Sequence, residues 1–120
     1  MNYELSQSFY FEAAHTLHRE IDADSSRRIH GHTYHAEVGI TGRPDAQTGM
    51  LVDLGHVRRE IERVRQQLDH RLLDEVPGVG AVTLENLCSY ILHELQDALP
   101  GITRVAVWRP ASGDRCTLTR

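Results

Sequence analysis

The most informative stretch of the 120-residue chain reads Arg28-Ile29-His30-Gly31-His32-Thr33-Tyr34-His35. In a β-strand alternate side chains point to the same face, so His30 and His32 would project side by side. The same parity continues through Tyr34, Ala36, Val38 and Ile40. This continuation predicts a strand over residues 30–42 with one buried face. A pair spaced His-x-His also arises by chance, or as half-buried polar residues at a strand end, so the pair alone leaves both interpretations open.

A segment upstream supplies a third histidine in matching register. Residues of one parity between 3 and 15 are mostly apolar, namely Tyr3, Leu5, Phe9, Phe11 and Ala13, and His15 is the next member. If the two strands are neighbours, three imidazoles meet at one end of one sheet face. Three neutral nitrogens leave the fourth position of a tetrahedral zinc ion for water or substrate, as in catalytic rather than structural sites. We therefore predict a Zn²⁺ site on His15, His30 and His32.

Length and composition predict a single soluble domain spanning residues 1–120. A net charge of −4 argues against nucleic acid or a membrane surface as a partner. No apolar run approaches the roughly 18 residues that a membrane span needs. Cys88 lies on the apolar stripe of a predicted helix, which indicates a buried free thiol. We expect a cytoplasmic protein that binds a small-molecule substrate.

The hydrophobic pattern predicts the order strand, strand, helix, helix, strand, strand. The predicted strands are residues 3–15, 30–42, 102–109 and 115–120. The predicted helices are residues 54–69, after the N-cap Asp53, and 84–99, after the N-cap Thr83. The polar connection over 16–29 is longer than a hairpin turn needs, which indicates a functional or mobile loop.

Two helices on one face of a four-stranded antiparallel sheet make an α+β layer structure. A small open sheet of this kind leaves long strand edges exposed. Covering those edges favours association, so we expect a homo-oligomer.

Five motifs, in chain order, resemble the 6-pyruvoyltetrahydropterin synthase and 6-carboxytetrahydropterin synthase family. They are Phe9-x-Phe11-x-Ala13-Ala14-His15, His30-Gly31-His32, Thr48-Gly49-Met50-Leu51-Val52-Asp53, Leu68-Asp69-His70-x-x-Leu73 and Thr83-x-Glu85. The resemblance implies a tunnelling fold, in which trimers close a β-barrel and stack as a hexamer with active sites between subunits. It also implies zinc on the three histidines already singled out. For the 6-carboxytetrahydropterin branch it further implies a place in the pathway to queuosine.

The resemblance also implies roles for other residues. In the family, zinc holds the side-chain hydroxyls of 7,8-dihydroneopterin triphosphate, and a thiolate and an Asp–His pair from a neighbouring subunit move protons. Asp69 and His70 match this Asp–His pair. An aspartate beside a histidine can fix its tautomer and raise its pKa, which suits a general acid or base. Otherwise His70 simply ends a helix, where the dipole favours it. Glu85 is expected to bind substrate, or else to complement the N-terminus of its helix.

Two positions depart from the family pattern. The family cysteine falls at Ser26, whose hydroxyl accepts a proton far less readily than a thiol with an ordinary pKa of about 8.5. The glutamate that anchors the pterin falls at Arg109. The ring edge presents two N–H donors, which a carboxylate accepts as a pair, whereas arginine has only donors. Each buried group left unpaired costs about 1–3 kcal/mol.

Arg109 therefore leaves three interpretations open. In the first, Asp114 or Glu85 supplies the hydrogen-bond acceptor for the ring that Arg109 lacks. In the second, Arg109 binds a carboxylate or phosphate of a different substrate. In the third, Arg109 points outward and the anchor lies elsewhere. Our leading hypothesis is a zinc-dependent lyase that converts 7,8-dihydroneopterin triphosphate to 6-carboxytetrahydropterin. The alternatives are a diverged zinc enzyme acting on a non-pterin acidic or phosphorylated substrate, and a non-catalytic metal-binding homologue.

Overall fold

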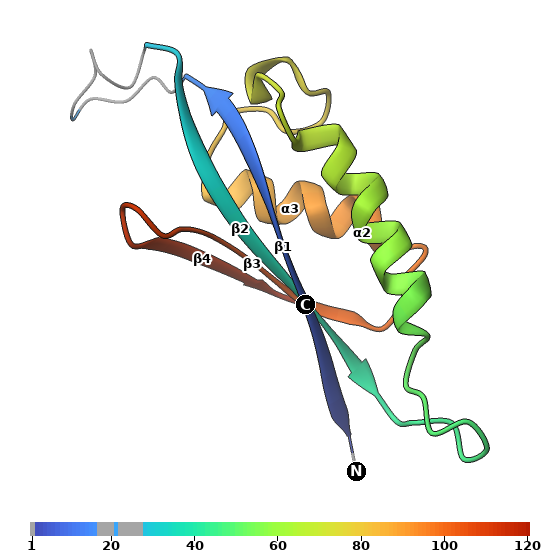
Figure 1. The fold of residues 1–120 in the computed structure, drawn as a ribbon. Coiled ribbons are helices and arrows are strands. Elements are labelled where there is room, and N and C mark those ends of the chain that lie inside the picture. Colours follow the sequence, from blue (N-terminus) through green and yellow to red (C-terminus); the bar gives the residue numbers. More distant parts are fainter. Residues whose placement is uncertain (1, 17–20, 22–27) are drawn as a thin grey trace.

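Seven elements make up the structure, a computed structural model that describes residues 2–16, 21 and 28–120. In chain order they are β1 (Tyr3–His15), β2 (His30–Gly42), α2 (Leu54–Leu68), the 3₁₀ helix η1 (Leu73–Glu75), α3 (Leu84–Leu95), β3 (Ile102–Arg109) and β4 (Asp114–Thr119). The strands form one antiparallel sheet in the order β1-β2-β3-β4, and α2 and α3 cover one of its faces (Figure 1). The predicted α+β arrangement is confirmed.

The covered face of the sheet carries the parity that the sequence predicted to be buried. Phe11 of β1 and Tyr34, Ala36 and Val38 of β2 are almost completely inaccessible to solvent. Against them pack apolar residues of the helices, which include Val57, Ile61, Val64 and Leu68 of α2 and Leu87, Cys88, Ile91 and Leu95 of α3. This packing fixes the register in which the ends of β1 and β2 meet.

Both predicted N-caps are confirmed. Asp53 accepts a hydrogen bond from the backbone N–H of Gly55 at 2.8 Å, and Thr83 accepts one from Asn86 at 3.1 Å. These bonds satisfy N–H groups that the first turn of a helix leaves without intrahelical partners. The start of α3 is thereby fixed, and Glu85 lies in its first turn.

The ends of several elements differ from the prediction. α3 ends at Leu95 rather than Leu99, because the chain passes through turns before Pro100. Leu99 is nevertheless buried, so its side chain continues the apolar stripe although its backbone is not helical. α2 ends one residue earlier than predicted, at Leu68, and β4 begins and ends one residue earlier, over Asp114–Thr119. η1 was not predicted.

The opposite face of the sheet carries a row of stacked rings across three strands. Tyr10 of β1 stacks on His35 of β2 with ring centroids 5.8 Å apart, and His35 stacks on Trp108 of β3 at 5.7 Å. The guanidinium of Arg115 in β4 lies 4.2 Å from the centroid of Trp108. His35 therefore points away from the three other histidines of the sheet, as its parity predicted. Over the ranges that the structure describes, no helix combines the length and apolarity needed to cross a membrane.

Candidate metal centre

Three histidine side chains meet where β1 ends and β2 begins. His15 lies directly opposite His30 in the antiparallel register, and His32 is opposite Ala13 two pairs further on. The ring centroids are 4.4 Å apart for His15 and His30, 4.9 Å for His15 and His32, and 4.8 Å for His30 and His32. One ligand nitrogen from each ring lies within 4.8 Å of the others. The predicted convergence of the three imidazoles is confirmed.

Main-chain carbonyls determine which nitrogens of two rings remain available. Nδ1 of His30 lies 2.7 Å from the carbonyl oxygen of Arg28, and Nδ1 of His15 lies 3.3 Å from that of Thr16. Because a carbonyl only accepts, each Nδ1 carries the proton and each Nε2 presents its lone pair. Nε2 of His15 is buried and has no hydrogen-bond partner among the described residues. Three convergent imidazoles with an orphaned lone pair are the donor set that zinc takes in catalytic sites.

The environment favours the neutral form of His15 and His32, which is the form that binds metal. Burial, with the nearby Arg109 guanidinium as the next contribution, lowers the pKa of His32 to about 4. Burial also lowers the pKa of His15, and the neighbouring His30 adds to this effect. Tyr34 lies beside the cluster, its ring centroid 5.5 Å from that of His32, and burial raises its pKa to about 12. Tyr34 therefore contributes an uncharged hydroxyl at neutral pH.

A cavity of about 490 Å³ opens in front of the three histidines. Its other walls are the first turn of α3, which includes Glu85, and the hairpin between β3 and β4, which includes Arg109 and Asp114. The structure thus brings both predicted substrate-binding residues, Glu85 and Arg109, into the space beside the predicted metal ligands. The cavity is large enough for a bicyclic ring with a short side chain.

Arg109 points into this cavity, so the interpretation in which it faces outward is wrong. Its Nη2 donates to Oδ2 of Asp114 at 2.7 Å, and its Nη1 lies 3.4 Å from Nε2 of His32. Its Nε is buried without a hydrogen-bond partner among the residues described. Asp114 also accepts a hydrogen bond from the hydroxyl of Ser112 at 2.9 Å. A cation and a carboxylate therefore both line the wall where the sequence resemblance implied a single carboxylate.

The Asp69–His70 pair is preformed at the C-terminal end of α2. Oδ2 of Asp69 lies 2.8 Å from Nδ1 of His70 and accepts a further bond from Arg65, while Oδ1 accepts from the backbone N–H of Glu12 at 2.9 Å. The bond from Glu12 is the largest contribution to a pKa of Asp69 below its ordinary value. The carboxylate therefore stays ionised and holds the His70 ring with Nε2 outward.

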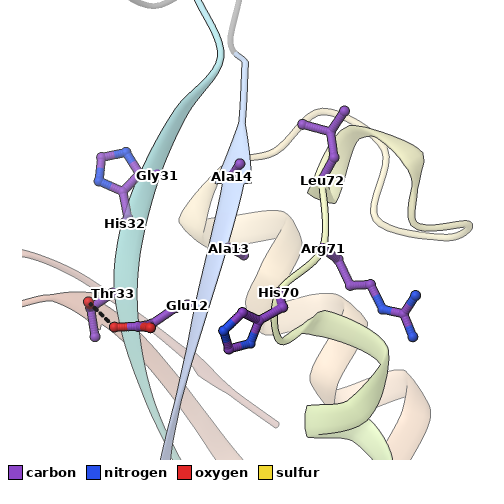
Figure 2. A pocket seen from close by; sticks show the side chains of 9 residues that line it. All are labelled: Glu12, Ala13, Ala14, Gly31, His32, Thr33, His70, Arg71 and Leu72. Carbon is purple, nitrogen blue, oxygen red and sulfur yellow. Dashed lines mark hydrogen bonds between the residues drawn. The ribbon is translucent and has the colours of Figure 1, made fainter.

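His70 occupies the outer edge of β1, away from the metal cavity of its own chain. Its backbone adopts a left-handed conformation with φ of 58°, and its N–H donates to the carbonyl of Glu12 at 2.6 Å. Its side chain is 77% exposed and lies beside a second cavity of about 520 Å³ (Figure 2). In Figure 2 the His32 ring points away from His70, with β1 and β2 running between the two rings. The lining of this second cavity includes His32 but neither His15 nor His30, and within one chain Asp69 and His70 do not line the cavity in front of the three histidines.

Ser26, the third predicted catalytic residue, lies outside the described residues. Sequence reasoning gave no role to Ser112, which lines the metal cavity, or to Thr16 and Asp74, which are hydrogen-bonded to each other next to His15. Thr16 and Asp74 are separated by 58 positions, so no local spacing connects them. Ser112 precedes Asp114 in a turn, where a serine carries little information of its own.

Comparisons with known proteins find relatives of this chain in sequence and in fold. The family model described as 6-pyruvoyl tetrahydropterin synthase matches residues 4–120. The 6-pyruvoyl tetrahydrobiopterin synthase of Homo sapiens is 32% identical over 111 residues, which cover 81% of this chain and 77% of that protein. The 6-carboxy-5,6,7,8-tetrahydropterin synthase of Synechocystis is 32% identical over 108 residues, with 84% and 81% covered. The structure of Caenorhabditis elegans 6-pyruvoyl tetrahydropterin synthase has the same fold, with a TM-score of 0.84 at 24% identity over 100% of this chain and 96% of that one.

Proposed function

The chain belongs to the 6-pyruvoyl tetrahydropterin synthase family, and on this basis we propose that it is a zinc-dependent lyase converting 7,8-dihydroneopterin triphosphate to 6-carboxytetrahydropterin. The observation that carries the proposal is the meeting of three imidazoles, one with a buried Nε2 that has no partner among the described residues, at the wall of a substrate-sized cavity. His15, His30 and His32 would hold the ion. Bound zinc supplies Lewis-acid chemistry, lowering the pKa of a hydroxyl on the substrate side chain.

Recognition of the ring falls to the wall opposite the histidines. Glu85 and Asp114 are the carboxylates that line this wall, and a pterin presents N–H donors to such acceptors. Arg109, bound to Asp114, sets the direction from which a ring reaches that carboxylate. In this proposal the anchoring carboxylate comes from β4 or α3 instead of from β3.

Proton transfer falls to His70 and to position 26. His70 Nε2 takes or returns a proton at the side chain of a substrate bound to a neighbouring subunit, because the ring is exposed at the edge of β1. Asp69 keeps the ring in the tautomer that this exchange requires. Ser26 stands at the position of the family thiolate, and its weaker acidity predicts slow turnover. The subunits assemble as a trimer or hexamer through the edge of β4 and the part of the β1 edge that precedes Glu12, which the segment before η1 does not cover.

A specific observation favours a second candidate. The guanidinium of Arg109 reaches to 3.4 Å from His32 and has one buried N–H group without a partner among the described residues. A carboxylate or phosphate would satisfy this group as a charge-assisted acceptor. The second candidate is therefore a zinc enzyme of the same fold that acts on an acidic or phosphorylated substrate other than a pterin.

One experiment tests the proposal and separates the candidates. The purified protein is analysed for bound metal and incubated with 7,8-dihydroneopterin triphosphate, with products identified by mass spectrometry. We expect about one zinc per chain, lost in His32→Ala and retained in the control His93→Ala, together with formation of 6-carboxytetrahydropterin. Zinc without turnover, and without calorimetric binding of neopterin, would remove the first candidate. Zinc without turnover of any acidic substrate would indicate a non-catalytic metal-binding homologue.

A further inference from the structure

A carboxylate outside the metal cavity holds the residue that follows the first histidine. Asp74, in η1, accepts two hydrogen bonds from Thr16: the backbone N–H reaches Oδ1 at 2.9 Å and the hydroxyl reaches Oδ2 at 2.6 Å. Burial raises the pKa of Asp74, but the contributions that lower it, of which the two bonds from Thr16 are the largest, bring the pKa below its ordinary value. The carboxylate is therefore ionised at neutral pH and both of its oxygens are engaged by one residue.

Thr16 in turn contacts the ring of His15. Its carbonyl oxygen lies 3.3 Å from Nδ1 of His15, just beyond the usual range for such bonds. At this distance the strength of the bond depends closely on the direction in which the carbonyl points. The clamp by Asp74 restrains Thr16 at both its backbone N–H and its β-branched side chain, which has few rotamers.

The surrounding backbone anchors this contact to the sheet. The N–H of Ala14 donates to the carbonyl of Arg71 at 3.0 Å, and Ala14 forms a parallel bridge with Leu72. The segment that leads into η1 therefore runs along the edge of β1 up to the point where Asp74 meets Thr16. The end of β1, the segment that leads into η1, and η1 itself are therefore joined by hydrogen bonds next to His15.

We propose that Asp74 is a positioning residue that acts through Thr16 to hold His15 in the tautomer and orientation of a metal ligand. Outer partners of metal-ligating histidines act in this way and change metal affinity about 10- to 100-fold when they are removed. The inference rests on the metal site of the proposed function. It adds to that site a residue, Asp74, that is not one of the three ligands but orients one of them.

The test measures metal binding directly. Zn²⁺ affinity is determined by competition with a chromophoric chelator for wild type, Asp74→Ala, Thr16→Val and Thr16→Ser. Glu75→Ala is the matched control, because it removes a neighbouring carboxylate from the same 3₁₀ helix. The visible absorption of the Co²⁺-loaded proteins reports ligand geometry, and the melting temperature of the metal-free proteins reports folding.

We expect Zn²⁺ affinity to fall about 10-fold or more in Asp74→Ala, with altered Co²⁺ bands. Thr16→Val, which keeps only the backbone bond, should lie between Asp74→Ala and wild type. Thr16→Ser should bind like wild type, since it keeps both donors. The two Thr16 variants keep the inference testable if Asp74→Ala does not fold.

A purely structural role for Asp74 would lower the melting temperature while leaving affinity and Co²⁺ bands equal to those of Glu75→Ala, and this result would overturn the inference. Equal affinity of Thr16→Val and Thr16→Ser would also overturn it. Failure of the proposed metal site itself gives a different result, in which wild type binds no Zn²⁺ that depends on His32.

Discussion

Arg109 and Asp114 face each other across the hairpin between β3 and β4, and their side chains form a 2.7 Å ion pair at the wall of the metal cavity. The pair allows a guanidinium to stand next to the neutral His32, because the carboxylate compensates its charge. A ligand that binds at this wall meets a hydrogen-bond donor, Arg109, and an acceptor, Asp114, side by side. Whether a pterin or an anion binds at this wall therefore depends on the balance between these two side chains.

Replacing Arg109 tests that balance. Arg109→Glu removes the donor that opposes the N–H groups of a pterin, so we expect neopterin to bind at least about tenfold more tightly by calorimetry. Arg109→Gln is the matched control, since it removes the charge without supplying a carboxylate. Tighter binding in both variants would assign the effect to loss of the cation alone. Weaker neopterin binding in Arg109→Glu would mean that Arg109 itself contacts the ligand, as the second candidate requires.

The part of the site that the sequence revealed depends on strand parity. Burial alternates along β1 and β2, so the histidines could be assigned to one face before any pairing was known, and the neighbouring strands then brought them together. The N-caps of α2 and α3 could likewise be predicted from residues that are adjacent in the sequence. Their residue types alone indicated the bonds that Asp53 and Thr83 make.

The remaining features depend on contacts between distant segments, which no local pattern records. Asp74 is joined to Thr16 only because the segment after α2 runs along the edge of β1. The end of α3 was misplaced because Leu99 is buried like a helical residue although the helix has already ended. The inward direction of Arg109 follows from its bond to Asp114, which depends on the register of the β3–β4 hairpin.

The stability of the metal-free protein should depend on pH through His32. Its pKa is about 4 in the folded protein and close to the ordinary value of about 6.5 when unfolded. Between these values the unfolded chain binds more protons, so the free energy of unfolding decreases as pH falls from about 6.5 to about 4. We expect urea unfolding in the presence of a chelator to show this loss between pH 7 and pH 5.

His32→Gln should flatten this dependence, whereas substitution of the exposed His93 by Gln should leave it unchanged. The lowered pKa of His15 acts in the same direction, so His32→Gln should retain part of the slope. A slope identical in wild type and His32→Gln would show that His32 is not the group responsible.

Turnover should respond to the chemistry of position 26. Ser26→Cys restores a thiol at the family position, and a positioned proton acceptor contributes about 10²- to 10⁴-fold to a rate. We expect turnover of 7,8-dihydroneopterin triphosphate to increase at least about tenfold, mainly in kcat. The adjacent Ser25→Cys adds the same group one position away and should have no effect. An equal response of the two variants would contradict a specific role for position 26.

Because His70 does not line the metal cavity of its own chain, we predict that each active site is shared between subunits. His32→Ala lacks a metal ligand and His70→Asn lacks the proton carrier, while asparagine tolerates the left-handed backbone at position 70. Each variant alone should be inactive. Co-expressed in equal amounts as mixed oligomers, they should recover about a quarter of wild-type activity, because about half of the subunits supply each intact part and the parts combine at random. His32→Ala co-expressed with the exposed-site variant His93→Ala should recover about half, which calibrates the mixing. If the mixed oligomers of His32→Ala and His70→Asn stay inactive while this control recovers, His70 does not act on the metal site of a neighbouring subunit.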